Sequence, residues 1–160
     1  MAKKRMVNIA NRQNARRLIG VLKKRMKKGV VVLNDFDRKD GSIHTWESYL
    51  RSRLRLNKNH EECIRWSETS SQTKYGLAQD PGRFIDGIER KSSAIPAHRL
   101  IWSIINQIDL ADLDDRFVIR HLCHNRDCVQ PHHLQLGTYY ENSRDTRLHK
   151  EGYCLIPHKG

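Results

Sequence analysis

Residues 120–146 read RHLCHNRDCVQPHHLQLGTYYENSRDT, and the expected fold is organised around this stretch. It holds the densest group of side chains that bind metal ions or transfer protons. These are His121, Cys123, His124, Cys128, His132, His133 and Asn142. No other part of the chain concentrates such residues, so this stretch is the first place to look for the function.

A metal-binding array stands at the centre of the stretch. Cys123, Cys128 and His133 follow a Cys-x4-Cys-x4-His spacing, which lets one short loop surround a single ion. Thiolate sulfur and neutral imidazole nitrogen are the ligands that zinc takes in closed tetrahedral sites. A structural site needs a fourth ligand, and the remaining cysteines, Cys63 and Cys154, are the candidates. The residues alone predict a structural zinc site and leave the choice between these two cysteines open.

The residues on either side of this loop alternate as β-strands do. Residues 117–119 are an apolar run that predicts a strand, and His121 stands at its end. Residues 134–136 alternate apolar and polar side chains, which predicts a second short strand. Gly137 is expected to end that strand. The two predicted strands therefore enclose the metal-binding loop.

A helix is predicted to begin directly after the second strand. Thr138 followed three residues later by Glu141 is a capping-box pattern, in which each side chain accepts a hydrogen bond from the other residue's backbone N–H. Asn142 comes next and lies near the start of this helix. The expected order is strand, metal loop, strand and helix, with His121 and Asn142 facing each other across the fold.

The motif as a whole is specific. It reads His121-x-Cys123-x-Asn125-x-x-Cys128-x-x-Pro131-x-His133-Leu134, followed by Gly137-Thr138-x-x-x-Asn142. It resembles the HNH nucleases of the His-Me finger, or ββα-metal, family. Within the family it is similar to the branch with a zinc-binding loop, which includes phage HNH endonucleases and the Physarum intron homing endonuclease.

Shorter pieces extend the resemblance upstream, to about residues 63–147. They are Cys63-x-x-Trp66, Tyr75-Gly76, Gly82-Arg83-Phe84 and Ala97-His98-Arg99, in that order. The chain departs from the family at one point. Residues 77–81 separate the Tyr-Gly and Gly-Arg-Phe pieces, which many relatives join as Tyr-Gly-Arg-Phe.

The resemblance implies an α+β fold with a ββα-metal core and a structural zinc loop, which the basic, mainly helical N-terminal region precedes. It implies that Cys63 is the fourth zinc ligand. It also implies that His121 is the general base, oriented by a backbone carbonyl, and that Arg83 donates to the phosphate. Histidine suits the role of base because its ordinary pKa of about 6.5 leaves it mostly neutral near pH 7. Asn142 offers the oxygen ligand that a catalytic Mg²⁺ requires.

The charge of the chain points to a nucleic-acid partner. Thirty Lys and Arg face eighteen Asp and Glu, and residues 1–28 hold eleven of the basic residues and no acidic one. A helix from Asn8 or Asn11 to about Lys28 is expected, with its apolar stripe opposite an Arg and Lys face. We expect this face to bind double-stranded DNA. The candidate contacts are Arg12, Arg16, Lys23, Lys24 and Lys27.

Three regions are predicted along the chain. Residues 1–60 form a basic, mainly helical region that serves as a DNA-binding arm, residues 61–150 form the nuclease domain, and residues 151–160 form a tail. Further strands are expected at residues 30–33, 63–66 and 83–88. Helices are expected at residues 42–56 and from Pro96 to Ile108, where the apolar residues recur at helical spacing.

Two other classes of function remain open. A non-catalytic, zinc-stapled nucleic-acid-binding protein explains the charge and the cysteines, and a basic ribosome-associated protein explains the charge alone. The residues leave a monomer and a homodimer equally open. We expect no membrane association, because no run of eighteen apolar residues occurs. An intracellular location, the bacterial cytoplasm if the gene is carried by a phage, fits cysteines used for metal binding.

Overall fold

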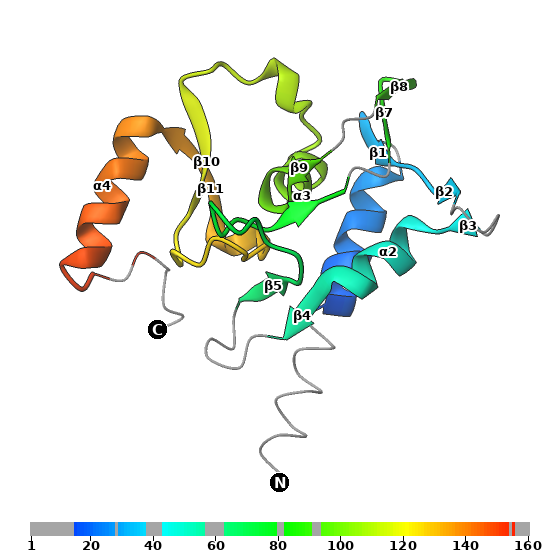
Figure 1. The fold of residues 1–160 in the computed structure, drawn as a ribbon. Helices are drawn as coiled ribbons and strands as arrows, with labels where there is room; N and C mark the ends of the chain where they lie inside the picture. The colour runs from blue at the N-terminus through cyan, green and yellow to red at the C-terminus, as the bar shows by residue number, and fades with distance from the viewer. Residues whose placement is uncertain are drawn as a thin grey trace, which may run out of the picture.

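The computed structural model describes residues 15–27, 29–37, 43–56, 63–79, 82–90, 94–153 and 155. These residues form a mixed α/β fold of small antiparallel sheets and helices (Figure 1). After a helix over residues 15–26, the elements are β1 (Val31–Leu33), β2 (Phe36–Asp37), β3 (Ile43–His44), α2 (Trp46–Arg53), β4 (Leu54–Leu56), β5 (Ile64–Trp66), β6 (Leu77–Ala78), β7 (Arg83–Ile85), β8 (Ile88–Arg90), β9 (Ile95–Pro96), α3 (Ala97–Asn106), η1 (Leu110–Asp112), β10 (Phe117–His121), η2 (Pro131–His133), β11 (Leu134–Thr138) and α4 (Tyr139–Lys150).

The hairpin of β10 and β11 stands between two helices. Its strands pair antiparallel from Phe117 with Thr138 to His121 with Leu134. α4 contacts both strands and α3 contacts β10, and Figure 1 shows α4 on the left of the hairpin and α3 on its right. The predicted order of strand, loop, strand and helix is confirmed.

The N-terminal helix belongs to the main hydrophobic core. Its predicted apolar stripe is confirmed, since Leu18, Ile19, Leu22 and Met26 are all buried. The same core cluster includes residues as distant in sequence as Val129. The packing therefore continues across the expected boundary near residue 60. Of the helices that the structure describes, none combines the length and apolar character that crossing a membrane requires.

The core helix α3 confirms the strongest apolar stripe of the sequence. Leu100, Ile101 and Ile104 have no exposed surface. The helix ends at Gln107, which adopts a left-handed conformation with φ of 54°. The Gln107 side chain accepts from the Val31 N–H at 2.9 Å and donates to the Val31 carbonyl at 3.0 Å. These bonds fasten α3 to β1 and keep the centre of the fold in place.

Two local predictions are wrong. The helix expected over residues 42–56 ends at Arg53, because Leu54–Leu56 forms β4 and pairs with β5. Gly137 does not end the second strand of the hairpin, since it lies within β11 and pairs with Val118. A Cβ at this position would come within 2.3 Å of Nε of Arg120. The glycine therefore provides room for a neighbouring side chain instead of interrupting the strand.

Candidate metal centre and adjoining cleft

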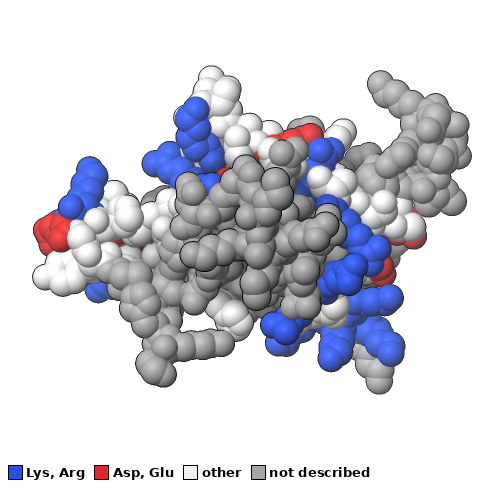
Figure 2. All heavy atoms as spheres, turned by 90° about the horizontal axis from the view of Figure 1, so that it is seen from below, with Lys and Arg blue, Asp and Glu red and all other residues white. Residues whose placement is uncertain are grey.

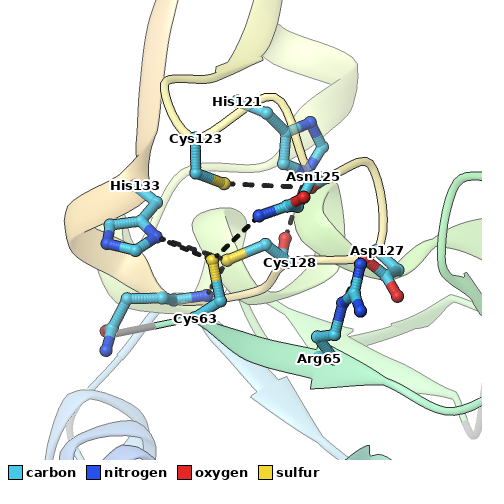
Figure 3. A network of polar contacts seen from close by, with 9 residues as sticks. Cys63, Arg65, His121, Cys123, Asn125, Asp127, Cys128 and His133 are labelled. Carbon is cyan, nitrogen blue, oxygen red and sulfur yellow. Dashed lines mark hydrogen bonds and ion pairs between the residues drawn. The ribbon is translucent and has the colours of Figure 1, made fainter. Parts of the chain in front are cut away.

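Cys63, Cys123, Cys128 and His133 meet in one place (Figure 3). Their ligand atoms all lie within 4.8 Å of one another, and three of the four residues are buried. Nδ1 of His133 is 3.4 Å from the Cys63 sulfur and 3.5 Å from the Cys128 sulfur. This cluster can hold a metal ion such as zinc, because three sulfurs and one imidazole are the donors of structural zinc sites.

Cys63 reaches the cluster because the metal loop is held against β5. Cys128 forms a β-bridge with Arg65. The Val129 N–H donates to the Ile64 carbonyl at 2.7 Å, and the Trp66 N–H donates to the Asp127 carbonyl at 2.8 Å. This pairing brings together segments about sixty residues apart. Cys154, the other candidate, lies outside the described residues.

The surroundings of the sulfurs favour the ionised form of Cys63, whereas the neighbouring Cys123 and Cys63 sulfurs and burial raise the pKa of Cys128. The Asn125 side-chain amide donates to the Cys63 sulfur at 3.3 Å, and the Gln130 N–H donates to the Cys128 sulfur at 3.4 Å. Contacts with the Cys123 and Cys128 sulfurs hold the pKa of Cys63 far below its usual value. A buried group of sulfurs that includes a thiolate attracts a cation, as metal binding requires.

A cleft of about 830 Å³ opens beside this cluster, and both His121 and Asn142 line it. His121 comes from the end of β10, and half-buried Asn142 comes from the first turns of α4. The structure thus brings the predicted base and the predicted Mg²⁺ ligand to one surface. Other polar residues that line the cleft include Tyr75, His98, Arg99, Asp114, Asp115, His124, Arg126, His149 and Lys150.

One hydrogen bond decides the protonation of the His121 ring. Its Nε2 lies 3.0 Å from the Cys128 carbonyl oxygen. A carbonyl oxygen only accepts, so Nε2 carries the proton and Nδ1 is left as an acceptor. Burial lowers the pKa of His121 to about 4. The ring is therefore neutral near pH 7 and able to take up a proton at Nδ1.

The rings of His98 and Tyr75 pack against the His121 ring. The His98 ring lies 4.3 Å from the His121 ring, and Tyr75 stacks on His98 at 5.3 Å. The Arg126 guanidinium covers the Tyr75 ring at 5.4 Å. Burial lowers the pKa of His98 to about 2, so a second neutral imidazole stands beside the first. Tyr75 belongs to one of the short pieces of the resemblance, but its contact with His98 and the position of Arg126 over its ring form only in the folded chain.

The capping box places Asn142 on α4. The Glu141 N–H donates to Thr138 Oγ1 at 3.2 Å, and the Thr138 N–H donates to Glu141 Oε1 at 3.2 Å. The predicted capping box is thus confirmed. It makes the first turn of α4 continuous with β11, so Asn142 follows the hairpin directly.

Arg83 lies apart from this cleft. It is on β7 and lines a second cleft of about 730 Å³. Arg99 lines both clefts, which also share Pro96 and two residues of η1. The structure therefore brings Arg83 next to the site but does not bring it into the same cleft as His121 and Asn142.

The two remaining histidines of the loop differ in their surroundings. His132 is exposed. His124 is half-buried, and its ring stacks on His149 of α4 at 4.1 Å. His149 carried no signal in the sequence, because its place in the cleft depends on how α4 packs.

The predicted basic face lies at the other end of the molecule. Arg16, Lys23, Lys24 and Lys27 are exposed on or just after the N-terminal helix, while Arg12 lies outside the described residues. Lys23 forms an ion pair with Glu47 at 3.2 Å. Figure 2 shows Lys and Arg gathered on the right, the side where Figure 1 has this helix, whereas α4 is on the left.

Comparison of the chain with protein-family models, with curated proteins and with solved structures gives no significant match.

Proposed function

We propose that this chain is a Mg²⁺-dependent HNH endonuclease with a ββα-metal core, and that it hydrolyses phosphodiester bonds of double-stranded DNA. One observation carries the proposal. A buried, neutral His121 whose Nδ1 is the acceptor nitrogen lines the same cleft as Asn142, and the loop between their elements supplies three of the four residues of a metal cluster.

His121 acts as the general base in this proposal. Its Nδ1 accepts a proton from the attacking water, and the Cys128 carbonyl stabilises the imidazolium that forms, because Nε2–H donates to it. The rings of Tyr75 and His98 keep the imidazole from turning. The base is therefore oriented before the substrate binds.

Asn142 is the proposed ligand of Mg²⁺, through its side-chain carbonyl oxygen. When bound, the ion stabilises the negative charge that develops on the phosphate and on the leaving 3′ oxygen. Arg83 and Arg99, in the adjoining cleft, donate to phosphate oxygens of the bound strand. The basic face of the N-terminal helix supplies further phosphate contacts.

The Cys63, Cys123, Cys128 and His133 cluster is assigned a structural zinc ion. Four protein ligands close the coordination sphere of zinc, so no position is left for water or substrate. The chemistry then belongs to the cleft, and the zinc holds the loop from which the Cys128 carbonyl reaches His121.

A non-catalytic, zinc-stapled nucleic-acid-binding protein is the second candidate. The exposed basic helix and the metal cluster favour it equally well. This candidate does not explain, however, why a backbone carbonyl fixes the tautomer of His121 in a cleft that Asn142 also lines.

Cleavage of supercoiled plasmid separates the two candidates. We expect the purified protein to nick or linearise the plasmid with Mg²⁺ and to leave it intact with EDTA. His121→Ala should slow cleavage about 100-fold or more, the usual contribution of a general base, and should retain DNA binding. His132→Ala is the matched control, since this histidine is exposed and outside the cleft. If the protein binds DNA but cleaves it in the presence of none of the divalent metals tested, the nucleic-acid-binding protein becomes the favoured candidate.

A further inference from the structure

We infer that the buried ion pair of Arg120 and Asp145 is a positioning device, which holds α4, and with it Asn142, at a fixed distance and angle from His121. This inference rests on the endonuclease proposed above. Arg120 directly precedes His121 on β10, and Asp145 lies one helical turn after Asn142 on α4. The pair therefore joins the two elements that carry the proposed chemistry.

One guanidinium connects the hairpin and the helix. Arg120 Nη1 donates to Asp145 Oδ2 at 2.6 Å, and its Nη2 donates to Gln135 Oε1 of β11 at 3.0 Å. The Glu141 carboxylate is 3.6 Å from the same Nη2. The side chains of Arg120 and Asp145 are only 6% and 4% exposed. A planar, forked donor that is held on several sides restricts angles as well as distances.

α4 has few other anchors, namely the capping box at its start and the stacking of His149 on His124. Asp145 is the buried residue of the helix, and no apolar side chain of α4 is buried among the residues that the structure describes. Leu148 is the one half-buried aliphatic side chain of α4 in the described chain, so apolar packing contributes little to how the helix lies on the hairpin. Gly137 adds a second indication, since it lacks the Cβ that would meet Arg120 Nε at 2.3 Å. The strand opposite is thus shaped to admit the guanidinium.

Stability alone does not explain a buried ion pair. The cost of removing two charges from water offsets most of their attraction, and apolar residues of similar volume often stabilise a fold as well or better. Apolar contacts, however, do not fix the angle between two elements as the hydrogen bonds of a guanidinium do. A displacement of α4 by about 1 Å would move Asn142 relative to His121, and errors of that size reduce rates by about 100-fold.

The test replaces the pair by apolar residues in the double variant Arg120→Met/Asp145→Leu. We expect it to keep its zinc content and melting temperature. Its cleavage rate at saturating Mg²⁺ should fall about 100-fold, and the Mg²⁺ concentration for half-maximal rate should rise. Arg120→Lys keeps the positive charge but loses the two-pronged guanidinium, so its cleavage rate should lie between those of the wild type and the double variant. Arg53→Met/Glu68→Leu removes an ion pair on α2, outside the cleft, and should cleave like the wild type.

A second readout does not depend on cleavage. Mn²⁺ bound by Asn142 broadens the side-chain amide signal of this residue in NMR spectra, and the double variant should lose this broadening at Mn²⁺ concentrations that suffice for the wild type. Unchanged rates and broadening in the double variant would overturn the inference. It would also fall if the double variant melts at a lower temperature while Arg120→Lys stays fully active, because the pair would then only stabilise the fold.

The two proposals can fail separately. If the wild type binds Mn²⁺ at Asn142 but never cleaves DNA, the endonuclease is rejected and the Mn²⁺ titration of the double variant still decides the positioning role. A wild type whose Asn142 signal does not respond to Mn²⁺ overturns both.

Discussion

A single backbone carbonyl gives His121 its proposed chemistry. The same imidazole at the surface would exchange its proton between both nitrogens, whereas the bond to the Cys128 carbonyl keeps the proton on Nε2. Burial then removes the charged form at neutral pH. Asn142 differs, since its amide needs only to face the cleft. The sequence identified both residues, but only the folded loop supplies the carbonyl.

Asn142→Ala should slow Mg²⁺-dependent plasmid cleavage by about 100-fold or more, since metal ligands support several kcal/mol of transition-state stabilisation. Zinc content and melting temperature should stay unchanged because the side chain is only half-buried. Ser143→Ala, an exposed change on the same helix, is the control. Full activity of Asn142→Ala would remove this residue from the mechanism.

Gly137→Ala should lower the free energy of unfolding by about 1–3 kcal/mol, the usual cost of overpacking. The new methyl group would meet the Arg120 side chain, which is itself held by Asp145. Gly20→Ala is the opposite case, because nothing lies within 4 Å of its Cβ and it sits in a helix. There alanine should stabilise by about 1 kcal/mol. Urea titrations of both variants measure the difference, and equal effects would contradict the close approach at Gly137.

At the scale of elements, α4 is a polar helix attached by its first turn, by one buried carboxylate and by the stacking of His149 on His124. The capping box joins it to β11, and Asp145 joins it to β10. Its start was readable in the sequence because a capping box involves residues three apart. Its attachment to β10 was not readable, since Arg120 and Asp145 are twenty-five residues apart.

Thr138→Ala should destabilise the chain by about 1 kcal/mol, as loss of a helix N-cap usually does. For a chain of this size the melting temperature should fall by about 2–4 °C. Thr146→Ala serves as the control, because its hydroxyl only donates back to the Asn142 carbonyl within the helix. If the two variants melt together, the capping box does not contribute to stability.

At the scale of the whole molecule, the metal cluster joins two distant segments of the chain that also pair through backbone hydrogen bonds between β5 and the metal loop. Cys63 precedes β5, whereas His133 belongs to the turn before β11. The main core already extends from the N-terminal helix to Val129 in the metal loop. A metal ion at the cluster would therefore stabilise the loop and the core together.

Cys63→Ser should abolish zinc binding and cooperative unfolding. Structural zinc contributes roughly 10 kcal/mol in small domains, which is comparable to the entire stability of a typical domain. Zinc analysis and thermal melts measure both effects, and a chelator should reproduce them in the wild type. Cys154→Ser is the matched control. Zinc loss in Cys154→Ser, with zinc retained in Cys63→Ser, would reverse the assignment of the fourth ligand.

By itself the sequence determined the local part of this protein. The hairpin, the capping box of α4, the stripe of α3 and the Cys-x4-Cys-x4-His spacing all depend on residues close together in the chain, where periodicity and short loops restrict the geometry. Tertiary structure alone decided what depends on distant segments. It brought Cys63 to His133, set Arg83 in a neighbouring cleft, continued β11 through Gly137 and gathered Tyr75, Arg126 and His149 in the cleft that His121 lines. Spacing carries no information about such contacts, because they follow from how the elements pack.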